Sequence, residues 1–251
     1  MSKITSAILI IGNEILFGRT QDANTQFIAI NLKKIGIILR EVRVVADTEN
    51  DIINSINELR NKYDYVFSTG GIGPTHDDIT SKSISKAFGL NYLIHPEAYA
   101  ILKNYYPENE LNSGRIKMTK MPEGAKLIKN KLTVAPGFFI QNVFVLPGVP
   151  KILQVMFLEV MKNLKRGKEI ISKTINTNLY ESIIAEELEK IQNKFNDCEI
   201  GSYPHFDFNN KTSKIGGVNI VVSGTNKLSV DLVIKKINLI ILKFDGKSQI
   251  L

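Results

Sequence analysis

The segment at 68–80 (STGGIGPTHDDIT) holds the densest set of residues suited to phosphate chemistry. Three glycines let the backbone turn tightly and direct its N–H groups at an anion, and a helix beginning near residue 78 adds the positive end of its dipole. The same pattern also fits a plain strand-to-helix turn in which Asp78 caps the helix. The residues that we expect to bind a phosphate or pyrophosphate here are Thr69, Gly70, Gly71, Gly73 and Thr75.

Several acidic residues belong to this segment or to loops that should converge with it. Asp77 and Asp78 lie in the segment, whereas Asp47 and Glu14 follow other expected strands. Carboxylate oxygens beside a phosphate are what a divalent cation bound to a phosphorylated substrate requires. We therefore expect Mg²⁺, Mn²⁺ or Co²⁺ at Asp77 and Asp78. His76 is either a further acid, base or ligand, or simply an exposed loop residue.

The elements that must position these residues alternate between strand and helix in the first half of the chain. Apolar or β-branched runs predict buried strands, and apolar residues at helical spacing predict the helices between them. This order gives a mostly parallel, doubly wound α/β sheet, whose ligands bind beyond the carboxyl ends of the strands. The loops carrying Glu14, Asp47 and Gly70 should therefore meet on one edge. The expected strands are 7–11, 37–45 and 65–68, and the expected helices are 25–34, 50–62 and 79–88.

The second half of the chain divides into the end of this domain and a smaller one. Strands at 137–140 and 143–146 and a helix at 152–164 complete the first domain, while the pattern between 90 and 131 is weak and 107–114 reads as a loop. We place the boundary at the polar, glycine-containing segment near 168. The domains are thus 1–168 and 169–251, and the second is a small α+β domain with helices on one face of its sheet.

Composition narrows the class of protein. With 43% hydrophobic residues among 251, the chain can fill a core, and no stretch is long enough to span a membrane. A single cysteine, Cys198, cannot form an internal disulfide, so we expect a cytoplasmic protein. The net charge of +7 comes from scattered lysines without a basic block, which argues against the remaining alternative, a nucleic-acid-binding module.

Five segments, taken together and in order, resemble the MoaB/Mog-type molybdopterin-binding fold. Within it, the chain is most similar to the N-terminal part of competence/damage-inducible protein A and to the matching domain of FAD synthase. The likeness extends positionally from 8 to 156, and the long GGIGPTHDDIT string is its most specific part. The segments are GNEIL at 12–16, GRTQDAN at 18–24, GGIGPTHDDIT at 70–80, APGF at 135–138 and LPGVP at 146–150.

The resemblance implies a pocket for a molybdopterin-like or dinucleotide ligand. In similar proteins that transfer an adenylyl group, the acids matching Asp47 and Asp78 position the metal and the transition state, so we expect these two residues to be catalytic. In the proteins that the chain resembles more, the activity is metal-dependent hydrolysis of a pyrophosphate bond in ADP-ribose or FAD. The alternative it implies is a molybdopterin-binding or adenylyl-transferring protein, because only the acceptor of the phosphoryl group differs. Further substrate contacts are expected at Gly12, Glu14, Pro147 and Gly148.

The chain departs from the proteins that it resembles in two ways, and the resemblance also leads to expectations about the small domain and the oligomeric state. Asn13 stands where similar proteins usually carry Asp or Thr, which predicts reduced activity if a carboxylate ligand is missing. The chain stops at Leu251, so the deamidase domain of some similar proteins should be absent. The small domain looks KH-like but lacks a Gly-x-x-Gly loop, so it is expected to serve as an interface. Proteins of this fold are commonly homo-oligomers, and we expect one here.

Overall fold

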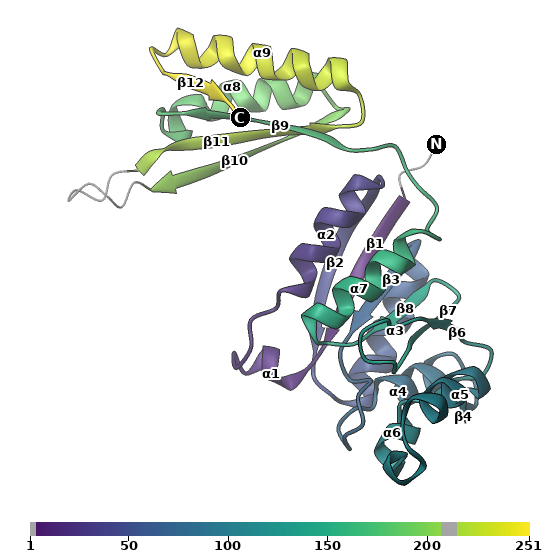
Figure 1. The fold of residues 1–251 in the computed structure, drawn as a ribbon. Helices are drawn as coiled ribbons and strands as arrows, with labels where there is room; N and C mark the ends of the chain where they lie inside the picture. The colour runs from purple at the N-terminus through teal and green to yellow at the C-terminus, as the bar shows by residue number, and fades with distance from the viewer. Residues whose placement is uncertain (1–3, 207–214) are drawn as a thin grey trace. The chain divides into compact units, whose positions relative to one another are not determined.

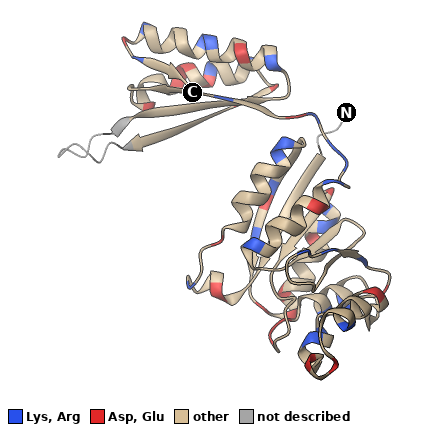
Figure 2. Ribbon diagram, in the orientation of Figure 1, with Lys and Arg blue, Asp and Glu red and all other residues tan. Residues whose placement is uncertain are grey.

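The computed structural model describes residues 4–206 and 215–251, which form two compact units, 1–167 and 168–251. Each unit has its own sheet and its own core, and we describe each by itself (Figure 1). None of the helices in these ranges combines the length and the apolar character that a membrane-spanning segment requires. Lys and Arg are spread over many elements instead of gathering in one block (Figure 2).

Unit 1 is built on a six-stranded sheet in the order β2-β1-β3-β8-β7-β6. The first four of these strands run parallel and the last two pair antiparallel, so the prediction of a mostly parallel sheet is confirmed. The strands are β1 (Ile4–Ile11), β2 (Ile37–Val45), β3 (Tyr65–Thr69), β6 (Lys126–Ile128), β7 (Gly137–Ile140) and β8 (Val143–Leu146), and β4 (Tyr92–Ile94) and β5 (Lys120–Pro122) form a separate pair.

Helices cover both faces of this sheet and give three layers. Because successive side chains of a strand point to opposite faces, Ile8 and Ile10 of β1 join one core cluster whereas Leu9 and Ile11 join the other. The first cluster lies under α2 and α7, and the second under α3 and α4. The helices are α1 (Asn13–Leu16), α2 (Asn24–Lys34), α3 (Glu49–Lys62), α4 (Thr80–Ala87), α5 (Pro96–Tyr105), α6 (Ser113–Lys117) and α7 (Pro150–Met161).

Local chemistry explains where α3 begins. The Thr48 side chain accepts a hydrogen bond from the Asp51 N–H, which satisfies one of the amides left open in the first turn. Acidic residues lie in that first turn and Arg60 and Lys62 in the last turn, as the helix dipole favours. The expectation of a loop at 107–114 is partly wrong, because a 3₁₀ turn occupies Glu108–Glu110 and α6 begins at Ser113 under an Asn112 cap.

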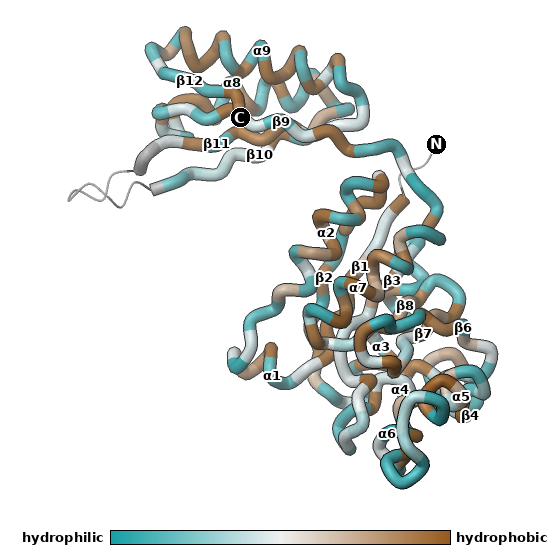
Figure 3. Tube along the Cα trace, viewed as in Figure 1, coloured by the Kyte–Doolittle hydropathy of each residue, from teal (hydrophilic) through white to brown (hydrophobic). Residues whose placement is uncertain are grey.

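Unit 2 is an antiparallel sheet in the order β10-β11-β9-β12 with α8 and α9 packed together over one core. Apolar and polar residues alternate along α9 (Figure 3), and Val230, Val233 and Ile237 contribute its buried side. This matches the expected small α+β architecture. The elements are β9 (Ile171–Thr177), α8 (Glu181–Lys194), β10 (Cys198–Phe206), β11 (Ile215–Gly224), α9 (Lys227–Lys243) and β12 (Ser248–Ile250).

Candidate functional site

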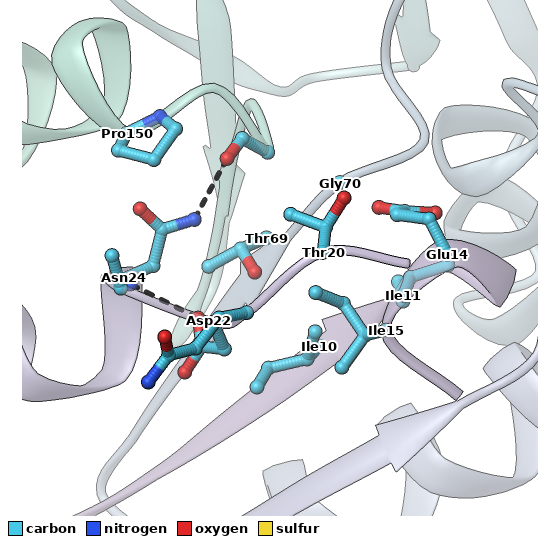
Figure 4. A pocket seen from close by; sticks show the side chains of 13 residues that line it. Ile10, Ile11, Glu14, Ile15, Thr20, Asp22, Asn24, Thr69, Gly70 and Pro150 are labelled. Atoms are coloured by element: carbon cyan, nitrogen blue, oxygen red, sulfur yellow. Dashed lines mark hydrogen bonds between the residues drawn. The ribbon is translucent and has the colours of Figure 1, made fainter. Parts of the chain in front are cut away.

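Loops from distant parts of the sequence meet beyond the carboxyl ends of β1, β3 and β8. They enclose a cavity of about 50 Å³, which is room for a few water-sized groups (Figure 4). Four of the predicted site residues line it: Glu14, Thr69, Gly70 and Gly148. The other predicted residues, Gly12, Asp47, Gly71, Gly73, Thr75, Asp77, Asp78 and Pro147, lie outside its lining.

The loop after β1 is tied to the loop after β2. The Gly12 N–H donates to the Val45 carbonyl at 3.2 Å, and the Asn13 N–H donates to Asp47 Oδ2 at 2.8 Å. Asp47 thus meets the backbone at position 13 and not its side chain. The carboxylate of Glu14 lies over Gly12, where a Cβ would be 2.5 Å from Glu14 Oε1. The structure therefore brings Gly12, Glu14 and Asp47 together.

The glycine loop after β3 is fixed by backbone contacts that only glycine allows. Gly70 has a φ of 101° and Gly71 a φ of 66°, in the region that other residues rarely adopt. A Cβ on Gly70 would lie 2.1 Å from the Ile11 carbonyl oxygen. A Cβ on Gly71 would lie 2.2 Å from Thr80 Oγ1, which is buried without a hydrogen-bond partner in the described structure. The loop is therefore pressed against both β1 and the start of α4.

The amides of this loop fall into two groups. The Gly70 N–H donates to the Leu146 carbonyl at 3.1 Å, and the Thr75 N–H donates to Asp78 Oδ2 at 2.8 Å. Within the described ranges, the N–H groups of Gly71, Ile72 and Gly73 have no protein acceptor. Consecutive amides that follow left-handed residues form a concave donor surface, and such surfaces accept anions. This is the feature predicted for phosphate binding.

Asp78 closes the loop on itself. Its Oδ2 accepts hydrogen bonds from both the N–H and the hydroxyl of Thr75, and its carboxylate packs against Gly73, where a Cβ would be 2.7 Å away. The interpretation of Asp78 as the cap of the next helix is wrong, because α4 begins at Thr80 with no side-chain cap. The carboxylate instead holds Thr75 and Gly73 in place.

The residues next to Asp78 are much more open. The His76 side chain is 98% exposed and the Asp77 side chain 65% exposed. The pKa of Asp77 is lowered, first by the Thr75 side chain and next by its own backbone N–H, so it is ionised at neutral pH. Lys117 on α6 donates a hydrogen bond from Nζ to the Thr75 carbonyl and adds a positive charge beside Asp77. Sequence reasoning treated Lys117 as one scattered lysine and so missed this contact.

The donor set suits a metal ion only if the ligand supplies part of the coordination. In the part of the chain that the structure describes, no three His, Cys, Asp or Glu side chains gather closely enough to hold an ion. Mg²⁺ usually keeps several waters and binds through one or two carboxylates together with substrate phosphates. The described carboxylates therefore do not fit a preformed protein cage, and a cation here would need oxygen ligands from a phosphorylated ligand.

The GRTQDAN segment contributes a second group of residues, and these were not predicted as site residues. Asp22 caps α2 by accepting from the Asn24 N–H at 2.9 Å and the Thr25 N–H at 3.2 Å. Asn24 is 5% exposed, and its Nδ2 donates to the Gly148 carbonyl at 2.8 Å. Its Oδ1 is buried without a partner among the described residues. Thr20, Asp22 and Asn24 all line the cavity, and the polar Asp-x-Asn pattern before an apolar helix was the available signal.

Gly148 joins the remaining loop to the site. A Cβ on Gly148 would lie 3.4 Å from the Gly70 Cα, so the loops after β3 and β8 touch at two glycines. Together with the Asn24 contact, this places the LPGVP segment against both the glycine loop and the start of α2. The five motif segments include four that converge here, namely those at 12–16, 18–24, 70–80 and 146–150.

Comparison with known proteins gives consistent matches for both units. Residues 7–166 match the family model described as a probable molybdopterin binding domain, and residues 169–239 match that of the FAD synthase middle domain. A protein of Archaeoglobus fulgidus is 31% identical over 229 residues, which cover 91% of this chain and 94% of that protein. The probable FAD synthase of Caenorhabditis elegans is 30% identical over 226 residues, covering 80% of this chain and 44% of that protein.

A solved structure supports the fold of unit 1. The crystal structure of the protein CinA, of unknown function, from Thermoplasma acidophilum superposes with a TM-score of 0.61 at 34% identity. The match covers 64% of this chain and 99% of that chain.

Proposed function

The chain belongs to the family of the probable molybdopterin binding domain, and from this premise we propose that it is a metal-dependent pyrophosphatase acting on ADP-ribose or a related dinucleotide. The glycine loop at 70–75 would hold the phosphates, and Asp47 and Asp78 would serve the chemistry. The observation that carries the proposal is the set of three consecutive N–H groups, at Gly71, Ile72 and Gly73, without protein acceptors in the described chain.

The position of these amides supports phosphate binding over an accidental turn. They follow β3 at the carboxyl end of a parallel sheet, where ligands of α/β proteins bind. Gly71, Ile72 and Gly73 are half-buried, so their N–H groups are accessible, and an anion at this point could accept hydrogen bonds from them. The loop is also fixed in advance by Gly70 and Asp78, so little conformational freedom is lost when the ligand binds.

The size of the cavity limits how a dinucleotide could bind. About 50 Å³ accommodates a phosphate-sized group or a few waters, not a nucleoside. The amides of Gly71, Ile72 and Gly73 lie outside the lining of this cavity, so we place the pyrophosphate at the glycine loop next to it, and the sugar and base groups on the open surface around the loop. Exposed Glu14 and Asp77 border this region, and Lys117 lies beside Asp77 to offset negative charge.

Hydrolysis here is an attack of water on one phosphorus atom, with cleavage of its bond to the bridging oxygen. A divalent cation, when bound, offsets negative charge on the phosphate oxygens, and Asp77 and Asp78 are the residues that would hold it. The loop N–H groups would stabilise charge on the non-bridging oxygens of the attacked phosphate. A carboxylate that accepts the proton of the attacking water completes the reaction, and Asp47, which is half-buried and oriented by the Asn13 N–H, is suited to this task.

The test compares Asp78→Asn and Asp78→Ala with the parent chain, using ADP-ribose, FAD and NAD with and without Mg²⁺, Mn²⁺ or Co²⁺. We expect Asp78→Ala to reduce hydrolysis about 100-fold or more, since it removes both a charge and the support of Thr75. Asp78→Asn can still accept from the Thr75 N–H, so it reports on the charge alone. His76→Ala is the matched control, because its side chain makes no buried contact and its loss should change the rate less than twofold.

The proposal is wrong if Asp78→Ala hydrolyses ADP-ribose at the parent rate, or if no substrate in the panel is cleaved with any of the metals. Retained ligand binding with lost hydrolysis in Asp78→Asn would support a chemical role for the carboxylate. Equal loss of binding and hydrolysis in both variants would show that Asp78 only shapes the loop.

A second candidate function is favoured by the family's own description. A molybdopterin-binding or adenylyl-transferring protein would use the same anion site with a phosphorylated pterin as the ligand or acceptor. Co-purified pterin fluorescence, or release of pyrophosphate from ATP that depends on molybdopterin, would favour this function over hydrolysis. The chemistry at phosphorus is the same, so only the panel of ligands separates the two.

A further inference from the structure

A groove in unit 2 is lined by residues that the function proposed above does not use. Helix α8 and strand β10 flank a cavity of about 330 Å³. This volume falls within the range of small-ligand and side-chain pockets. The residues that line it are Glu181, Ala185, Leu188, Glu189, Gln192, Ile200 and Ser202.

Strand β10 offers the groove an open edge. It is the first strand in the order β10-β11-β9-β12, so only one of its sides is paired. The Gln192 side chain accepts from the Ile200 N–H at 2.8 Å and donates to the Cys198 carbonyl at 2.8 Å, which shows that these residues direct their backbone groups away from β11. Because bonded and non-bonded pairs alternate in an antiparallel ladder, Ser202 also directs its N–H and carbonyl outward.

The open part of this edge is short and bounded. Gln192 occupies the backbone groups before it, and Pro204, which has no N–H, lies two residues after Ser202. The outward groups that remain are the Ile200 carbonyl and the N–H and carbonyl of Ser202. A segment of a few extended residues would satisfy them, whereas a long strand from a second sheet would be blocked at Pro204.

The groove is lined by apolar residues and by two glutamates. Ala185, Leu188 and Ile200 provide the apolar contacts between helix and strand. The Glu181 carboxylate accepts from the Ser202 hydroxyl. Among the described residues Glu189 forms no ion pair, whereas its neighbour Lys190 pairs with Glu186 and Glu187. The groove is therefore locally acidic on a chain whose net charge is +7.

We propose that this groove binds a short, extended, basic peptide segment of a partner protein, which adds as a strand to β10 at Ser202. Addition of a strand to an open edge beside a helix gives affinity through main-chain hydrogen bonds, and alternate side chains give specificity. Here the set of side chains that faces α8 would lie over Leu188 and Ile200. Basic side chains of this set would lay their apolar stems there and reach Glu181 and Glu189 with their charged ends, which sets the charge of the partner.

The first experiment measures fluorescence anisotropy of the full chain with three labelled, end-blocked hexapeptides. One alternates lysine and valine, the second alternates glutamate and valine, and the third is the lysine peptide methylated on every backbone nitrogen. We expect saturable binding of the first peptide only. The second has the wrong charge, and the third keeps the charge but cannot donate main-chain hydrogen bonds.

Two matched variants locate the peptide. Glu189→Lys reverses a charge in the groove and should weaken the lysine peptide by about tenfold. Glu199→Lys makes the same charge change on the neighbouring strand position, which faces the other side of the sheet, and should change the affinity less than twofold. Circular dichroism checks that both variants keep the fold of the parent.

The proposal is overturned if the lysine peptide does not bind, if the methylated peptide binds equally well, or if Glu199→Lys weakens binding as much as Glu189→Lys does. The first result would show that the groove does not bind such a peptide. The second would show that main-chain hydrogen bonds are not used, and the third would show that only unspecific attraction between charges acts. None of these readouts uses catalysis, so they do not depend on the function proposed for unit 1.

Discussion

The two units leave backbone hydrogen-bonding groups open in different ways. In unit 1 the open groups are amides of a loop, at Gly71, Ile72 and Gly73, where they suit a compact anion. In unit 2 they lie along the edge of β10 around Ser202, where they suit another extended chain. In unit 1 parallel strands end together and collect their loops at one side of the sheet, whereas in unit 2 the open groups belong to β10, the first strand of its sheet.

Each unit nevertheless contains a glycine of positive φ that presses against the backbone of a neighbouring strand. A Cβ on Gly70 would lie 2.1 Å from the Ile11 carbonyl oxygen in unit 1, and a Cβ on Gly217 would lie 2.0 Å from the Thr177 carbonyl oxygen in unit 2. Both glycines have positive φ, of 101° and 137°. Substitutions at these two positions therefore test whether each unit can lose stability without affecting the other.

The largest effect is expected from Gly70→Ala. The added methyl group must displace the backbone of β1, and the positive φ adds strain, so we expect a loss of about 4 kcal/mol in the free energy of unfolding. Urea unfolding followed by circular dichroism measures it, and binding of ADP-ribose should be lost as well. Peptide binding by unit 2 should survive; a joint loss would contradict the separation of the two units.

Gly217→Ala should produce the converse result. We expect unit 2 to lose about 3 kcal/mol, since the methyl group meets the Thr177 carbonyl, while hydrolysis by unit 1 stays within twofold of the parent. Gly89→Ala is the control for both variants, because its φ is also positive but no atom lies within 4 Å of the new Cβ. Its loss should be about 1 kcal/mol, and a similar loss for all three glycines would show that φ alone matters.

Asn24→Ala is expected to have an intermediate effect that is confined to unit 1. The substitution removes the hydrogen bond from the buried Asn24 side chain to the Gly148 carbonyl, which costs about 1.5 kcal/mol of stability. It also releases the contact between two of the converging loops, so the affinity for a phosphorylated ligand should fall. Isothermal titration with ADP-ribose measures the second effect, and unchanged affinity would show that the loops hold their positions without Asn24.

The smallest expected effect is a loss of stability that depends on pH and occurs in unit 1 only. The pKa of Glu41 is lowered from 4.5 to about 2, first by Lys62, then by Arg43 and Tyr63. Its stabilisation is therefore present above pH 4.5 and is lost as the pH falls towards 2. Glu41→Gln should reduce the stability of unit 1 by about 1 kcal/mol at pH 7 and by nothing near pH 2. A constant difference across this range would contradict the assignment.

Much of the fold could be predicted because the sequence pattern is local. The strands at 137–140 and 143–146 occur with the expected bounds, since each is a continuous apolar or aromatic run and the turn residue Gln141 adopts a positive φ. The strands β4, β5 and β6 were not predicted, because three residues are too few to show a period. Strand β12 was missed for the same reason.

The site could be predicted only where its residues are close in sequence. The glycine loop and its acids form one segment, so their chemistry was visible before their geometry. The bond between Asn24 and Gly148 joins residues 124 positions apart, and the contact between Lys117 and Thr75 joins residues 42 apart. No local pattern predicts such pairs, because they depend on which loops the sheet brings together. The metal site and the catalytic residues stay predictions.

The hydrogen bond between Asp47 and position 13 determines which substitutions this position tolerates. The donor is a main-chain N–H at 2.8 Å, which every amino acid except proline possesses. Replacing Asn13 with Asp, Thr or Ser should therefore leave the carboxylate where it is. The orientation of Asp47 therefore depends on the backbone path at position 13 and does not depend on which side chain is attached there.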